Sequence, residues 1–141
     1  MTAPTRTTVA WSEAQGKAVV LGRNGGDGGV CERCNMARAT DFAHRKRRSQ
    51  GGSWSPANGC ALCRRCHDWC GENPDAAKAG GWEVPGHADP EQTPVWLWHE
   101  YRAGWWLLAF LDDGDPRRSH VLVPVDPAEW GLPVVPEGAH S

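Results

Sequence analysis

The first regular pattern of apolar residues lies near the beginning of the chain, in the stretch WSEAQGKAVVLGRNGG. Ser12 followed by Gln15 fits a capping box, in which the two side chains close the first turn of a helix. Three apolar residues then share one helical face, namely Ala14, Ala18 and Leu21. The glycines after Asn24 end the pattern, so this stretch predicts a short helix.

The middle of the chain alternates between short apolar runs and turn residues. Residues 37–46 favour a short strand, and the stretch SQGGSWSPANG after it is rich in turn formers. The segment CALCRRCHDWC is typical of a turn that passes into a helix. A further helix is expected to have Asn73 as its cap and Pro74 at its first position, and to end at Gly80 and Gly81.

The second half of the chain has longer apolar runs that are rich in Trp, Val and Leu. They predict strands near residues 94–100, 105–111 and 120–125, with DDGD as a turn before the last one. Two tryptophan pairs are expected to pack within this sheet rather than to form a binding surface, namely Trp96/Trp98 and Trp105/Trp106. The Pro-rich end, residues 127–141, is expected to be loosely held.

The composition suits one domain of ordinary size. The chain has 141 residues, of which 40% are hydrophobic and nine are Trp, and its seventeen Gly and eleven Pro imply many turns. No apolar run approaches the roughly 20 residues of a membrane span, and the N-terminus lacks the apolar segment of a signal peptide. We therefore expect a soluble, cytoplasmic protein without a membrane partner, whose closely spaced thiols bind metal rather than form disulfides.

The charges are distributed unevenly along the chain. Residues 31–70 carry eight Lys and Arg against three acids, whereas residues 71–141 carry four against twelve. A basic block beside an acidic one favours a polyanion-binding site backed by a segment that limits nonspecific binding. Two solvated faces without function are the simpler alternative, but the basic block coincides with the cysteines, which favours a site.

Two CxxC pairs, Cys31/Cys34 and Cys63/Cys66, are separated by 28 residues. A tight turn between two thiols lets both sulfurs reach one tetrahedral zinc ion, and two such pairs make a closed structural site. Cys60 competes with Cys66, because CALC is also a CxxC, but Ala and Leu between its thiols suit a buried segment. His67 is another candidate, in a Cys₃His site. Cys60 and Cys70 are otherwise expected to be small core residues.

The run CERC…AHRKRRSQGG…ANGCALCRRCH resembles the HNH (ββα-metal) endonucleases, in the zinc-knuckle branch that is common in tailed bacteriophages. The resemblance covers about residues 15–80. It implies an α+β fold in which a ββα-metal core follows a helix and precedes a short antiparallel β extension. The expected segments are a flexible N-terminus (1–12), the nuclease core with structural zinc (13–81), a Trp-rich β extension (82–126) and a Pro-rich tail (127–141).

The same resemblance implies roles for three polar residues. His44 matches the general base, since an imidazole titrates near neutral pH and can take a proton from water. His67 matches a ligand of the catalytic divalent cation, Mg²⁺ or Mn²⁺, and Asn58 matches the residue whose amide braces the loop that aims His44. Phosphates of DNA, the expected partner, would be met by a basic run of Arg45, Lys46, Arg47 and Arg48. Without this register, His44 would be a positive surface residue and Asn58 a turn residue.

Two positions depart from the pattern of the family. Its second metal ligand, Asp or His, usually precedes the general base, where this chain has Ala43. The cation would then be held by His67, water and phosphate, or be reached by Asp41. Gly71 replaces a histidine that is frequent in related phage sequences. The expected function is therefore a phage HNH endonuclease of the host cytoplasm, with the terminase or another packaging protein as a partner. The alternatives are a zinc-dependent DNA-binding module whose nuclease activity has lapsed, and a structural adaptor.

Overall fold

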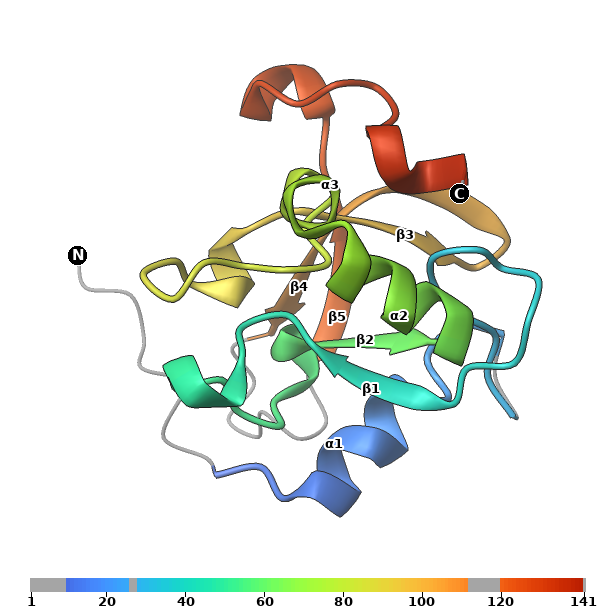
Figure 1. The fold of residues 1–141 in the computed structure, drawn as a ribbon, viewed down its shortest axis with the longest axis vertical. Coiled ribbons are helices and arrows are strands. Elements are labelled where there is room, and N and C mark those ends of the chain that lie inside the picture. Colours follow the sequence, from blue (N-terminus) through green and yellow to red (C-terminus); the bar gives the residue numbers. More distant parts are fainter. Residues whose placement is uncertain (1–9, 26–27, 112–119, 141) are drawn as a thin grey trace.

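The computed structural model describes residues 10–25, 28–111 and 120–140. These residues form an α+β structure with two small antiparallel sheets, as expected (Figure 1). The helices are α1 (Glu13–Val20), α2 (Arg64–Glu72) and α3 (Pro74–Ala79). The strands are β1 (Asp41–His44), β2 (Gly59–Leu62), β3 (Val95–His99), β4 (Arg102–Phe110) and β5 (His120–Pro124). No helix in the described part is long and apolar enough to cross a bilayer.

Helix α1 begins with the predicted capping box. The hydroxyl of Ser12 accepts a hydrogen bond from the backbone N–H of Gln15 at 3.1 Å, and the Gln15 side chain accepts one from Ser12 N–H at 3.0 Å. Gly16 lies against the backbone of Trp54, where a Cβ atom would overlap the carbonyl. This close approach lets α1 cover one face of the β1–β2 hairpin.

The hairpin and α2 together form a ββα unit. β1 pairs antiparallel with β2, so that Ala43 faces Cys60 and His44 faces Gly59. Side chains alternate between the two faces of a strand, and here Phe42 packs toward α1 whereas Ala43 belongs to the core beneath α2. The hairpin therefore lies between two helices, with α2 starting directly after β2 (Figure 1).

The C-terminal sheet has the order β3–β4–β5 and closely follows the three predicted strands. β4 begins three residues earlier than expected, because Glu100 and Tyr101 adopt φ of 50° and 66° and form a tight turn that pairs His99 with Arg102. Trp96, Trp105 and Trp106 are buried, which confirms sheet packing for these three tryptophans. The predicted DDGD turn lies outside the described residues.

One core runs through both halves of the chain. Buried residues of the ββα unit, such as Cys66, belong to the same hydrophobic cluster as Trp96 and Leu108 of the C-terminal sheet. The backbone joins the two parts as well, since Trp98 N–H donates to the Glu32 carbonyl at 2.7 Å. The core thus extends across residues 81–82, where we expected the nuclease core to give way to the extension.

The Pro-rich tail is not loosely held, contrary to expectation. Its last turn, Glu137–His140, packs against α3, and Pro136 and Gly138 are buried. The tail carries a glycine where its backbone meets two tryptophan rings, and this contact is not visible in a local pattern of Pro and Gly. The N-terminal residues 1–9, also expected to be flexible, lie outside the described part.

Candidate functional site

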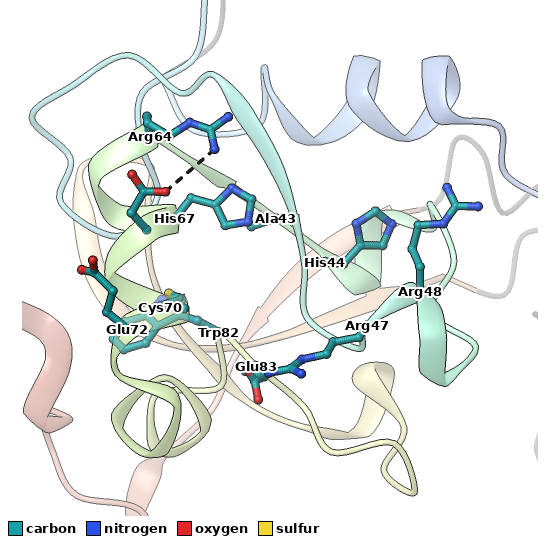
Figure 2. A pocket seen from close by; sticks show the side chains of 12 residues that line it. Ala43, His44, Arg47, Arg48, Arg64, His67, Cys70, Glu72, Trp82 and Glu83 are labelled. Atoms are coloured by element: carbon teal, nitrogen blue, oxygen red, sulfur yellow. Dashed lines mark ion pairs between the residues drawn. The ribbon is translucent and has the colours of Figure 1, made fainter.

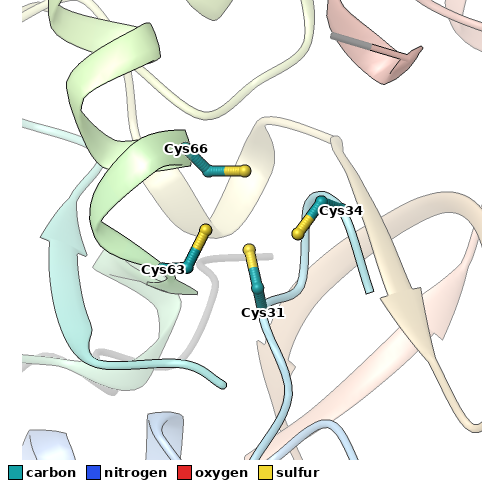
Figure 3. A group of neighbouring side chains, drawn as sticks. All are labelled: Cys31, Cys34, Cys63 and Cys66. Atoms are coloured by element: carbon teal, nitrogen blue, oxygen red, sulfur yellow. The ribbon is translucent and has the colours of Figure 1, made fainter. Parts of the chain in front are cut away.

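Four cysteines gather where the CERC turn meets the first turn of α2 (Figure 3). Cys31 and Cys34 belong to a turn closed by a 2.9 Å hydrogen bond from Asn35 N–H to the Cys31 carbonyl, whereas Cys63 caps α2 and Cys66 lies in its first turn. All four Sγ atoms lie within 4.8 Å of one another. Zinc–sulfur bonds of about 2.3 Å in a tetrahedron separate sulfurs by about 3.8 Å, so the cluster can hold one zinc ion.

This four-cysteine site (Cys31, Cys34, Cys63 and Cys66) confirms the predicted pairing and leaves out its competitors. Cys60 lies in β2 and Cys70 at the last turns of α2, both buried in the hydrophobic core. A hydrogen bond with Cys66 and burial raise the pKa of Cys31 to about 12. Zinc must therefore displace a proton from this thiol, and its affinity falls as pH falls.

His67 follows Cys66 directly but points the other way, toward β1 (Figure 2). Its Nδ1 lies 2.8 Å from Oδ2 of Asp41, and an Arg64 nitrogen lies 3.1 Å from the same oxygen. Burial by itself would raise the pKa of Asp41, but hydrogen bonds from His67 and Thr40 and the charge of Arg64 outweigh it and lower this pKa. The carboxylate is thus ionised near neutral pH and accepts the Nδ1 proton of His67.

Asp41 and Ala43 are two positions apart in β1, so both side chains point to the face that α2 covers, where Asp41 reaches His67. Ala43 lies on that face as well, buried and without a polar atom to offer. Asp41 therefore brings a carboxylate to the α2 side of the hairpin from a position two residues before Ala43. Asp41 is therefore a hydrogen-bond partner of His67, and its role as a ligand of the cation stays a prediction.

His44 occupies the end of β1 among aromatic rings. Its ring centroid lies 4.4 Å from that of Trp54, edge to face, and 5.0 Å from that of Phe42. Nε2 is buried and has no hydrogen-bond partner, which leaves Nδ1 as the nitrogen available for chemistry. Burial, followed by the charge of Arg48, lowers the pKa of His44. The imidazole is therefore neutral at pH 7 and can accept a proton.

His44 and His67 line one open pocket of about 560 Å³, here called the His44–His67 pocket (Figure 2). Ala43 lies between the two histidines on its wall. The pocket is also lined by three arginines, Arg47, Arg48 and Arg64, and by three acids, Asp68, Glu72 and Glu83. The sequence did not single out Arg64, although its place three residues before His67 puts both on one face of α2.

Asn58 holds the loop that leaves β1. Its Oδ1 accepts a hydrogen bond from Lys46 N–H at 2.7 Å, and its Nδ2 donates to the carbonyls of Lys46 and Ser53, both at 3.0 Å. The side chain is buried. These three bonds join the residues after His44 to those before β2, which is the bracing geometry that the resemblance implied.

The basic run after His44 does not act as one surface. The prediction that Arg45 meets DNA phosphates is wrong, because its side chain is fully buried. Its guanidinium donates to the backbone carbonyls of Ala57, Gly81, Pro90 and Thr93 at 2.7 to 2.9 Å. Strand alternation turns Arg45 inward. Lys46 is half-buried, whereas Arg47 and Arg48 are exposed.

No family model, curated protein or solved structure matches this chain.

Proposed function

We propose that the protein is a metal-dependent endonuclease of the HNH type, which hydrolyses phosphodiester bonds of DNA. The observation that carries this proposal is the His44–His67 pocket itself. His44 and His67, the latter hydrogen-bonded to Asp41, line one cavity with three arginines on a ββα unit, beside a closed four-cysteine site. Such a cavity combines a proton acceptor, a candidate cation ligand and phosphate-binding side chains.

His67 would hold the catalytic cation, Mg²⁺ or Mn²⁺, through Nε2. Its Nδ1 proton is engaged by Asp41, and a carboxylate in this position fixes the tautomer and orients a metal-binding imidazole. The bound cation would act as a Lewis acid on the phosphate. Ala43 provides no donor at the position where the family pattern has its second ligand, so we expect the cation to bind weakly.

His44 would take the proton from the attacking water at Nδ1. Its lowered pKa keeps it unprotonated at neutral pH, and the rings of Trp54 and Phe42 restrain its orientation. Asn58 would act as a positioning residue through the loop that it braces. Arg47, Arg48 and Arg64 would bind backbone phosphates, which favours affinity without sequence preference.

A plasmid-nicking assay with Mg²⁺ or Mn²⁺ tests the enzyme. We expect the wild-type protein to nick DNA and His44→Ala to lose roughly 10²–10⁴-fold in rate, the usual contribution of a general base. His87→Ala is the matched control, because His87 is exposed and does not line this pocket. Equal rates for wild type and His44→Ala with every metal would contradict the proposal.

A DNA-binding module without cleavage is the second candidate. Ala43 favours it, as does the double engagement of Asp41 by His67 and Arg64. In that case a gel-shift assay would detect DNA binding, weakened by Arg48→Gln, while no metal supports nicking. Association with a phage terminase rests on the resemblance alone and stays a prediction.

A further inference from the structure

We propose that Arg33 and the C-terminal tail (residues 133–140) form an outer shell of the four-cysteine zinc site, so that zinc retention and tail docking stabilise each other. Arg33 is the second residue between Cys31 and Cys34, and only 1% of its surface is exposed. Neither this arginine nor the tail belongs to the proposed nuclease machinery, and the proposal holds whether or not the protein cleaves DNA.

The guanidinium of Arg33 bridges a zinc ligand and the tail. Nη1 donates to Sγ of Cys66 at 3.3 Å, and Nη2 donates to the carbonyl of Gly138 at 2.6 Å. The two contacts use different nitrogens of one planar, rigid group, so their geometries depend on each other. Residues more than 100 positions apart in the chain are thereby joined through a single side chain at the metal.

Two tryptophans hold this guanidinium in place. Its central carbon lies 3.7 Å from the ring centroid of Trp69 and 5.3 Å from that of Trp82. The rings stand edge to face with centroids 5.9 Å apart. Gly138 fits against both, since a Cβ atom there would overlap ring atoms of Trp69 and come within 2.9 Å of Trp82. The tail carbonyl can reach Arg33 only because this residue has no side chain.

Electrostatics makes the coupling favourable. A zinc ion with four thiolates carries a net charge of −2, and a buried guanidinium in direct N–H···S contact offsets part of it. Bound zinc therefore strengthens the attraction between the cysteine thiolates and the Arg33 guanidinium. The guanidinium is then held where Nη2 donates to the Gly138 carbonyl. Such coupling is reciprocal, because whatever the metal adds to tail docking the docked tail adds to metal binding.

The test compares full-length Gly138→Ala with Glu137→Ala, an exposed neighbour in the same turn. Zinc affinity is measured by competition with a chromophoric chelator, and docking by hydrogen exchange of peptides from residues 133–140. We expect Gly138→Ala to weaken zinc binding by roughly tenfold, the lower end for outer-shell changes, and to speed exchange in the tail while zinc is bound. Glu137→Ala should leave both unchanged.

Arg33→Lys provides the second arm. Lysine keeps the charge but lacks the planar group that makes both contacts, so we expect weaker zinc binding together with a faster-exchanging tail. The double variant Arg33→Lys/Gly138→Ala should then lose less than the two single losses combined. Wild-type zinc affinity in a Gly138→Ala chain whose tail exchanges fast would overturn the proposal. So would an unchanged tail in zinc-loaded Gly138→Ala.

Discussion

The four-cysteine site and the His44–His67 pocket share the first turns of α2, yet the first is closed by protein ligands and the second is open. Four identical ligands from two CxxC turns enclose the first, whereas two histidines, His44 and an Asp41-bonded His67, line the second, which is open to solvent. A closed tetrahedral set fills every coordination position of its metal with protein ligands. An open pocket is completed only by water, cation and substrate, so its function has to be tested by chemistry.

The largest effect is expected from a substitution that removes one ligand of the four-cysteine site. Cys63→Ser should abolish tight zinc binding and with it the native fold. A structural zinc site contributes about 10–16 kcal/mol of apparent binding free energy, comparable with the roughly 5–15 kcal/mol of net stability of a whole domain. Metal analysis and thermal unfolding followed by circular dichroism measure the loss. Cys70→Ala, a core cysteine outside the site, should keep one zinc per chain, and zinc loss from this control would contradict the ligand assignment.

A smaller effect is expected at the open site from Asp41→Asn. The amide keeps the shape of the side chain but removes the charge that holds the Nδ1 proton of His67. We expect the divalent cation to bind roughly 10–100-fold more weakly, as for other partners of metal-binding histidines. Cleavage rates as a function of Mn²⁺ concentration give the measurement. If the concentration for half-maximal cleavage stays the same, Asp41 does not orient the ligand.

Ala43→Asp would add a second protein ligand for the cation in the His44–His67 pocket. The new carboxylate would face the pocket beside His67 and provide the ligand that is usual in the resembled family. We expect the Mn²⁺ concentration for half-maximal cleavage to fall on the order of tenfold, which corresponds to about 1.4 kcal/mol. Ala43→Asn serves as the control of similar size without charge. Equal metal dependence of both variants would exclude a ligand at this position.

The smallest effect concerns the protonation of His44. Its pKa lies below the ordinary value of about 6.5 because of burial and Arg48, so the neutral base persists as pH falls below that value and is lost only at the lower folded pKa. Trp54→Leu would admit water and move this pKa upward. NMR titration of His44 measures the shift independently of activity, and the acid limb of the cleavage profile should move with it. An unchanged titration curve would show that packing against Trp54 does not lower the pKa of His44.

Local signals in the sequence account for most helices and strands of this fold, although residues 59–62, expected as a turn, form β2. The Ser12–Gln15 capping box, Pro74 at a helix start and the paired CxxC turns each depend on residues within a few positions, and all three are confirmed. The three strands of the C-terminal sheet follow from apolar runs in the same way. The contact between Asp41 and His67, by contrast, has no local signal, because only the packing of the hairpin against α2 brings the two side chains together.

Three buried arginines depart from what local patterns indicate. A basic run predicts a solvated surface, but Arg45 lies inside and donates to four backbone carbonyls, and Arg33 joins the zinc ligands to the tail. Arg23 is buried in a similar way, with nitrogens 2.7 and 2.8 Å from the carboxylate of Glu32. Burial of a guanidinium is tolerated when carbonyl or carboxylate oxygens accept its hydrogen bonds, as they do around Arg23 and Arg45.

The sequence by itself therefore determined the metal ligands and most helices and strands, because short-range spacing and capping decide those. Only the tertiary structure decided which arginines face solvent, how the tail docks and which carboxylate accompanies His67. These outcomes depend on carbonyls and side chains that come from distant parts of the chain, and no local pattern records where those parts will meet.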